Sequence, residues 1–207
     1  GDLYDFYMDG NHLYFLIGDV SGKGVPASLF MAITRSLFRT LSQHVLSPAK
    51  IVTEMNNSIS DNNESNMFVT LIVGILDLET GILKLCNAGH NPPILIYPDG
   101  QVSYLEFKTQ IFVGVVEDFK YSDEEVVLEK ESKLFLYTDG VTEAENINKE
   151  LYGEEKLLGM LSDNASSDVR TTVNVVVDSI ASHVKEAEAS DDLTILLIQY
   201  EPGTANS

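Results

Sequence analysis

Residues 11–38, NHLYFLIGDVSGKGVPASLFMAITRSLF, contain the change of pattern on which the fold prediction depends. The run 11–18 is mostly apolar, as in a buried strand, and the glycines around Asp19 predict a flexible turn. Pro26 suits the first turn of a helix. The apolar residues that follow recur at helical spacing: Phe30, Ile33, Leu37 and Leu41. This stretch therefore predicts a strand, a turn that carries an aspartate, and an amphipathic helix over 26–43.

The rest of the chain continues in blocks of helices and blocks of hairpin strands. Ser47 and Pro48 form an N-cap and a first-turn proline before a second apolar stripe that ends near 61. Strands are predicted at 67–78, 82–87, 94–97, 101–105, 126–128, 133–138 and 193–200, and further helices at 154–161 and 169–184. Because helices and strands do not alternate strictly, the pattern favours an α+β fold with mostly antiparallel sheet.

Composition limits the classes of partner. The 207 residues include 32 acidic and 13 basic side chains, a formal net charge of -19. Such a chain repels nucleic acid and anionic membrane surfaces, and no apolar run is as long as a membrane span. The lone Cys86 excludes an internal disulfide and indicates a reducing compartment, so we expect a cytoplasmic domain that contacts neither nucleic acid nor membrane.

Three aspartates adjoin apolar runs: Asp19 in FLIGD, Asp139 in FLYTDG and Asp191 in DDLTILLI. A buried carboxylate is costly unless it is paired or bound to metal. Any one of them alone is better explained as a cap of a turn or helix, but three with matching placement predict one acidic cluster. Carboxylates without a nearby His or Cys suit Mg²⁺, Mn²⁺ or Ca²⁺ better than zinc. Asp2 and Asp5, near the start of the chain, are further candidates for this site.

Two loops invite a functional interpretation. Residues 18–24, GDVSGKG, are rich in glycine, but they lack the spacing of a P-loop or a dinucleotide fingerprint. Lys23 is either a phosphate contact or a solvated loop lysine. His90, in AGHNPP, is more simply a turn histidine than a proton donor, although a role in positioning the site stays open.

At these residues the chain resembles the bacterial SpoIIE/RsbU-type branch of the metal-dependent protein phosphatases, relatives of protein phosphatase type 2C. The matching segments follow one another in order over nearly the whole chain. They are GDLYDFY (1–7), IGDVSGKGVPASLFMA (17–32), NMFVTLIVGILD (66–77), NAGHNPPILI (87–96), LFLYTDGVTEAEN (134–146), YGEEKL (152–157) and SDDLTILLI (190–198).

The resemblance implies a four-layer αββα sandwich of two antiparallel sheets flanked by helices. It implies hydrolysis of phosphoserine or phosphothreonine on a protein by metal-activated water, with two Mn²⁺ or Mg²⁺ ions and no protein nucleophile. The family's metal positions fall on Asp19 as the bridge, the Val20 backbone carbonyl, Asp139 and Asp191. Asp2 matches an acid that the family carries near its metal site. Asp192 is the second candidate, after Asp191, for the last ligand position.

The resemblance also implies partners and a place in a longer protein. Members of this branch act on a phosphorylated STAS-type anti-sigma-factor antagonist in partner-switching signalling, and they follow a sensory or receiver domain. The helix over 26–43 is then the expected lever for control. We expect a single domain over 1–207, a C-terminal fragment that lacks the family's opening strand and whose exposed sheet edge invites a homodimer. The full-length protein is either cytoplasmic or membrane-tethered through an N-terminal part.

One departure from the wider family leaves the proton donor unassigned, because Ser21 stands where eukaryotic type 2C enzymes carry a histidine. The alternative to an active phosphatase is a catalytically silent regulatory binding module with the same fold. A metal-dependent nuclease would use the same acids, but it fits poorly with a net charge of -19.

Overall fold

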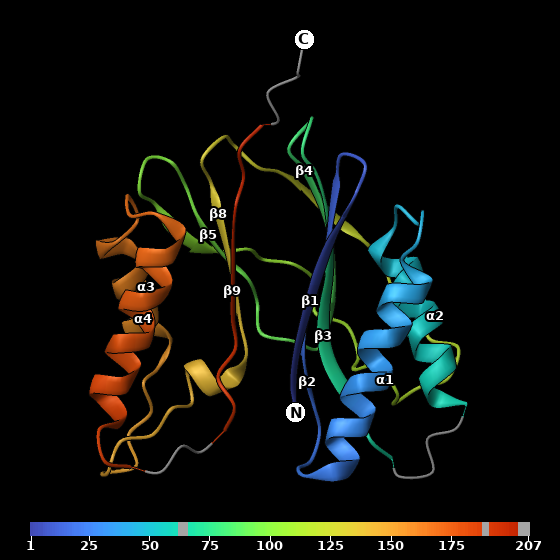
Figure 1. The fold of residues 1–207 in the computed structure, drawn as a ribbon, viewed down its shortest axis with the longest axis horizontal. Helices are drawn as coiled ribbons and strands as arrows, with labels where there is room; N and C mark the ends of the chain where they lie inside the picture. The colour runs from blue at the N-terminus through green and yellow to red at the C-terminus, as the bar shows by residue number, and fades with distance from the viewer. Residues whose placement is uncertain (62–65, 188–190, 203–207) are drawn as a thin grey trace. The chain divides into compact units, whose positions relative to one another are not determined.

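The structure is a computed structural model that describes residues 1–61, 66–187 and 191–202 (Figure 1). The chain divides into two compact units, each built on its own antiparallel sheet. Unit 1 comprises the described residues within Gly1–His90 and Phe107–Leu128, together with Pro202. Unit 2 comprises those within Asn91–Glu106 and Glu129–Glu201.

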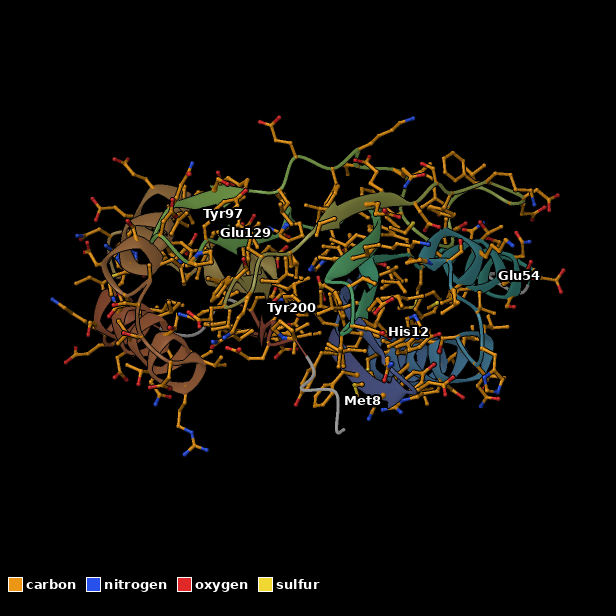
Figure 2. The ribbon with its side chains drawn as sticks, turned by 90° about the horizontal axis from the view of Figure 1, so that it is seen from above. Met8, His12, Glu54, Tyr97, Glu129 and Tyr200 are labelled. Atoms are coloured by element: carbon orange, nitrogen blue, oxygen red, sulfur yellow. The ribbon has the colours of Figure 1, made fainter. Side chains whose placement is uncertain are left out.

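Unit 1 contains a five-stranded sheet with the strand order β1-β2-β3-β4-β7. Its strands are β1 (Asp2–Asp9), β2 (His12–Val20), β3 (Val69–Asp77), β4 (Ile82–Ala88) and β7 (Glu124–Val127). Every neighbouring pair is antiparallel. The β1–β2 hairpin turns between Asp9 and His12, beside the labelled Met8 and His12 in Figure 2.

Two helices, α1 (Val25–Leu41) and α2 (Pro48–Ser60), cover one face of this sheet (Figure 1). Apolar side chains at helical spacing meet strand residues that point to the same side, and together they form a buried core that includes Tyr14, Leu16, Phe38, Met55 and Val73. Ser47 caps α2 as predicted, since its hydroxyl accepts the Lys50 N–H at 3.2 Å. α1 ends at Leu41, two residues before the predicted boundary.

Unit 2 contains a four-stranded sheet with the order β6-β5-β8-β9 and two helices. Its elements are β5 (Ile94–Ile96), β6 (Val102–Tyr104), β8 (Lys133–Tyr137), the 3-10 turn η1 (Asp139–Val141), α3 (Glu154–Asp163), α4 (Val169–Val184) and β9 (Ile195–Gln199). α4 is helical despite its many β-branched residues, because Asp168 caps it through the Thr171 N–H and its Val176 and Ile180 side chains are buried in the core of unit 2.

The first strand was not predicted from the sequence. Asp5 and Asp9 interrupt the apolar alternation of β1, yet the segment pairs with β2 along its whole length. β1 lies at the edge of the sheet, and both backbone polar groups of Phe6 have side-chain partners: the N–H donates to Asp5 Oδ1, and the carbonyl accepts from Arg39. Side chains thus protect part of an exposed strand edge.

The predicted α+β fold with two antiparallel sheets and associated helices is confirmed. None of the helices in the described part of the chain combines the length and the apolarity needed to cross a membrane.

Candidate metal centre

In unit 1 the strand register places two predicted site residues together. Asp2 lies directly opposite Asp19 in the β1–β2 ladder, and Asp19 lies opposite Thr70 in the β2–β3 ladder. Residues that face each other in antiparallel strands have their Cβ atoms about 4.5–5.5 Å apart on one face of the sheet. Asp2 and Asp19 are both half-buried. The two carboxylates therefore share one face of the sheet at the open end of the β1–β2 hairpin, opposite its turn.

A carboxylate oxygen and a carbonyl oxygen converge beside this pair. A Cβ atom added to Gly1 would lie 2.6 Å from Asp19 Oδ1 and 2.6 Å from the Val20 carbonyl oxygen. The two oxygens therefore lie close to one point beside Gly1, and both are hard donors of the kind that Mg²⁺ and Ca²⁺ prefer. Asp19 and Val20, both predicted from the sequence, fit a divalent cation.

The loop after Val20 is held by Ser21, the residue at the position of the missing histidine. Its backbone N–H donates to the Phe68 carbonyl at 2.9 Å, and its hydroxyl accepts the Phe68 N–H at 2.9 Å. Gly22 and Gly24 then adopt φ of 87° and 76°, which glycine tolerates best, and α1 begins. Ser21 therefore fixes the loop that joins the acidic pair to α1.

His90 is 4% exposed and contacts the neighbour of Asp19. Its Nδ1 lies 2.9 Å from Thr70 Oγ1, and the Thr70 hydroxyl also lies 3.4 Å from the Asp19 carbonyl. The Asn87 side chain binds both the N–H and the carbonyl of His90. His90 is thus a turn histidine, as the simpler interpretation held, and its ring also contacts β3 at Thr70, the residue that pairs with Asp19 of β2.

In unit 2 the remaining predicted ligands lie just beyond the end of the β8–β9 ladder: Asp139 follows β8, and Asp191 and Asp192 precede β9. The ladder pairs Tyr137 with Ile195. Beyond that pair, the Thr138 N–H donates to the Thr194 carbonyl at 3.1 Å, and the Thr138 hydroxyl accepts the Thr194 N–H at 3.1 Å. Asp139 follows Thr138 directly and begins η1. These bonds hold Asp139 beside the segment that precedes β9.

A close backbone approach fixes the second acidic pair against η1. A Cβ atom on Gly140 would overlap the carbonyl oxygen of Asp192. The Asp192 N–H donates to Asp191 Oδ1 at 2.9 Å, which turns the Asp191 carboxylate back onto its own backbone. Asp139, Asp191 and Asp192 therefore belong to one local arrangement.

The burial argument that singled out the aspartates was only partly right. Asp19 and Asp139 are half-buried, but Asp191 and Asp192 are exposed. The apolar run that follows them becomes strand only at Ile195, so the two acids lie in a turn and not at a buried strand end. The prediction that Asp191 and Asp192 lie near a strand was therefore correct, but the expectation that they are buried was wrong.

Asp5, which the sequence offered as a further candidate for this site, has a structural role. It is 4% exposed, and its carboxylate accepts hydrogen bonds from Arg39 at 2.6 and 2.5 Å and from Arg35 at 3.1 Å. Burial raises the pKa of Asp5, but the hydrogen bonds and charges of Arg39 and Arg35 outweigh it and hold the pKa below its usual range. The two arginines, spaced i, i+4 on one helix, were the signal that could have revealed this.

The predicted ligands divide between the units: Asp2, Asp19 and Val20 lie in unit 1, and Asp139, Asp191 and Asp192 lie in unit 2. Among residues 1–61, 66–187 and 191–202, no three His, Cys, Asp or Glu side chains group closely enough to form a metal site. Each unit by itself carries hard oxygen donors of the kind that Mg²⁺ and Mn²⁺ prefer.

Cys86, the single thiol, plays no part in this chemistry. It is buried in the core of unit 1, and desolvation raises the pKa of its thiol far above the ordinary value. The prediction of a packed thiol is confirmed.

Comparison with known proteins identifies a family and a fold. The family model described as Stage II sporulation protein E (SpoIIE) matches residues 9–201. Phosphoserine phosphatase RsbU of Bacillus subtilis (strain 168) is 26% identical over 200 residues, which cover 96% of this chain and 59% of RsbU. The chain spans between 35% and 59% of the length of the first curated relatives that it matches.

Solved structures show the same fold. The SiaA-PP2C domain of Pseudomonas aeruginosa aligns with a TM-score of 0.86 and 21% identity, over 97% of this chain and 80% of that one. The catalytic domain of the serine/threonine protein phosphatase PstP, in complex with 2 manganese ions, aligns with a TM-score of 0.66 and 14% identity, over 95% of this chain and 90% of its own.

Proposed function

Because this chain belongs to the SpoIIE family, we propose that it is a metal-dependent phosphoprotein phosphatase that hydrolyses phosphoserine or phosphothreonine. The observation that carries the proposal is the convergence of Asp19 Oδ1 and the Val20 carbonyl on one small volume, beside the carboxylate of Asp2. The relative RsbU, a phosphoserine phosphatase by name, supports the substrate class.

The proposed ligands are Asp19, the Val20 carbonyl, Asp139 and Asp191, with Asp2 and Asp192 adjoining them, and the proposed cofactor is a pair of Mn²⁺ or Mg²⁺ ions. The two manganese ions of PstP support this count. Such ions polarise a phosphoryl oxygen and lower the pKa of a bound water.

The chain's own contribution is to hold these oxygens in place before substrate arrives. The β-ladders fix Asp2 and Asp19, the Ser21–Phe68 bonds fix the loop that presents the Val20 carbonyl, and His90 supports Thr70 behind them. In unit 2, the Thr138–Thr194 bonds do the same for Asp139. Ligand groups that are already fixed lose less entropy when they bind.

The partners follow from the family. We propose that the substrate is a phosphorylated STAS-type anti-sigma-factor antagonist and that the domain works in the cytoplasm. A sensory or receiver domain would control it through α1, which begins directly after the Ser21–Gly24 loop. A homodimer, and a single phosphatase domain over 1–207, complete the proposal.

The test is hydrolysis of p-nitrophenyl phosphate and of a phosphoseryl STAS protein with Mn²⁺, with EDTA added afterwards. We expect turnover that EDTA stops, and a loss of at least about 100-fold in kcat/KM for Asp19→Ala and for Asp139→Ala, since each removes a charged ligand. Asp178→Ala, an exposed carboxylate on α4, is the matched control and should keep full activity. Unchanged Mn²⁺-dependent turnover in both ligand variants would refute the assignment.

Calorimetry decides between this function and the silent binding module. An active enzyme should bind Mn²⁺ in a way that Asp19→Ala weakens. No detectable Mn²⁺ binding at about millimolar concentration, the weak end of protein affinities for such hard cations, would favour the module.

A further inference from the structure

Two arginines of α1 share one carboxylate of β1. Arg39 binds Asp5 through two N–H groups, at 2.6 and 2.5 Å, while Arg35 reaches the same carboxylate through Nε alone, at 3.1 Å. Two positive charges thus meet one negative charge. Asp2 lines the same cavity as these three residues, so the two arginines and two aspartates around it carry no net charge together.

The two guanidinium groups differ in how many of their N–H donors have a partner. Arg39 also donates to the Phe6 carbonyl at 2.9 Å and lies 4.7 Å from the centre of the Tyr7 ring. Arg35 is 56% exposed, and within the described residues its Nη1 and Nη2 groups contact no acceptor. The planar end of Arg35 therefore presents four N–H donors that can bind a further oxyanion.

Arg35 lines a cavity of about 440 Å³ between β1 and α1, within unit 1. Arg39 and Met31 form its helix side, Tyr4 and Phe6 lie on its strand side, and Asp2 lies at the start of that strand. Tyr4 and Phe6 are each 54% exposed. Leu3 and Asp5 complete the lining, so the cavity combines apolar residues with two ion-paired groups, Asp5 and Arg39, and with the incompletely paired Arg35. It also reaches Asp2, the strand residue that faces Asp19.

We infer that this cavity binds the side chain of an aspartate or glutamate that lies close to the phosphoserine in the substrate. Arg35 binds the carboxylate through its two Nη groups, a geometry that suits guanidinium better than ammonium. Tyr4 and Phe6 contact the neighbouring peptide. The negative charge of Asp2 keeps the substrate carboxylate at the Arg35 end. This inference rests on the proposed phosphatase function and adds a specificity site to it.

The test compares phosphoserine peptides that differ only by Glu or Gln, placed in turn at each position flanking the phosphoserine. For at least one position, the unaltered chain should hydrolyse the Glu peptide with a kcat/KM about 3- to 10-fold higher, mainly through KM, as for a half-exposed charge-assisted pair. Added salt should reduce this preference. In Arg35→Gln the ratio should fall to about 1, and in Arg35→Glu it should favour a Lys peptide. Arg170→Gln, an exposed arginine on α4, should keep the full preference.

Two results would overturn the inference. One is equal hydrolysis of every Glu and Gln pair by the unaltered chain. The other is an Arg35→Gln variant that loses rate equally on all peptides and on p-nitrophenyl phosphate, since this would assign Arg35 to the phosphoryl group or to the fold. If the unaltered chain does not hydrolyse p-nitrophenyl phosphate at all, the proposed function fails separately. Anisotropy with labelled, unphosphorylated Glu and Gln peptides then tests the docking site alone, and equal affinities would reject it.

Discussion

The two units hold their acidic residues in different ways. In unit 1, Asp2 and Asp19 are opposite residues of a continuous ladder, and backbone bonds on both sides of β2 fix them. In unit 2, Asp139 begins a short 3-10 turn, and Asp191 and Asp192 lie exposed in the turn before β9. A ladder distributes the positioning over many hydrogen bonds, whereas the unit 2 arrangement depends on a few contacts. Single substitutions should therefore disturb the second arrangement more.

The largest effect is expected at Gly140. Alanine there overlaps the Asp192 carbonyl, a backbone atom that cannot rotate away, so the turn carrying Asp191 must move. We expect Gly140→Ala to weaken Mn²⁺ binding by more than about 100-fold and to lower the free energy of unfolding by about 1–3 kcal/mol. Calorimetry and urea denaturation measure these two quantities. Gly159→Ala, in α3 with open space around it, should instead stabilise by about 0.5–1 kcal/mol.

Asp191→Asn and Asp192→Asn separate the two exposed acids of unit 2. If Asp191 is the ligand, its amide variant should lower Mn²⁺ affinity by about 10- to 100-fold, while Asp192→Asn should change it by less than about 3-fold. Both residues are exposed, so thermal unfolding without metal should barely change. The reverse order of affinities would make Asp192 the ligand.

Thr138→Val and Thr70→Val test how much each unit depends on one hydroxyl. The Thr138 side chain is fully buried and its hydroxyl accepts the Thr194 N–H, so valine there removes this bond and leaves the half-buried Thr194 N–H without that acceptor. We expect a decrease of about 1–3 kcal/mol in the free energy of unfolding from urea titrations. Thr70 is half-buried within a ladder, so Thr70→Val should cost less. Equal losses would contradict the contrast between the units.

The smallest effect concerns the pH dependence that Asp5 gives to unit 1. The folded-state pKa of Asp5 is lowered, so its ionised form stabilises the fold above the unfolded pKa of about 3.9, and this stabilisation is lost as pH falls through the folded value. The difference in unfolding free energy between the unaltered chain and Asp5→Asn should be greatest near neutral pH. It should shrink below about pH 4. Urea titrations over this range provide the measurement, and a difference that does not vary with pH would exclude the mechanism.

Much of the fold followed from periodicity, because helices and central strands bury regular apolar stripes. α2 and α4 agree closely with their predicted ranges. β1 was missed because the buried charge of Asp5 breaks its apolar pattern. The residues that make this buried charge tolerable, Arg35 and Arg39, lie 30 and 34 residues further along the chain. The i, i+4 spacing of the two arginines indicates a cationic pair on one helix face, but a local pattern does not identify the distant acid that the pair binds.

The site shows the same division between local and long-range information. Asp19 and Asp139 were found from their place beside apolar runs, and Val20 from the family resemblance. The supporting bonds of Ser21, Thr70 and Thr138 depend on strand register, which the sequence does not specify residue by residue. The exposure of Asp191 depends on where β9 begins, and strand boundaries are among the least certain features of a sequence.

The path of the chain through the units has a practical consequence. Residues 107–128 belong to unit 1 although they lie between two segments of unit 2, and β7 within them completes the sheet of unit 1. During synthesis, that sheet must wait for its last strand until β5 and β6 have left the ribosome. No single proteolytic cut or gene truncation separates the two units cleanly, because residues 1–128 still include 91–106 of unit 2, and a fragment that begins at 91 still includes 107–128 of unit 1. Studies of an isolated half would need a circular permutant or a pair of co-expressed fragments.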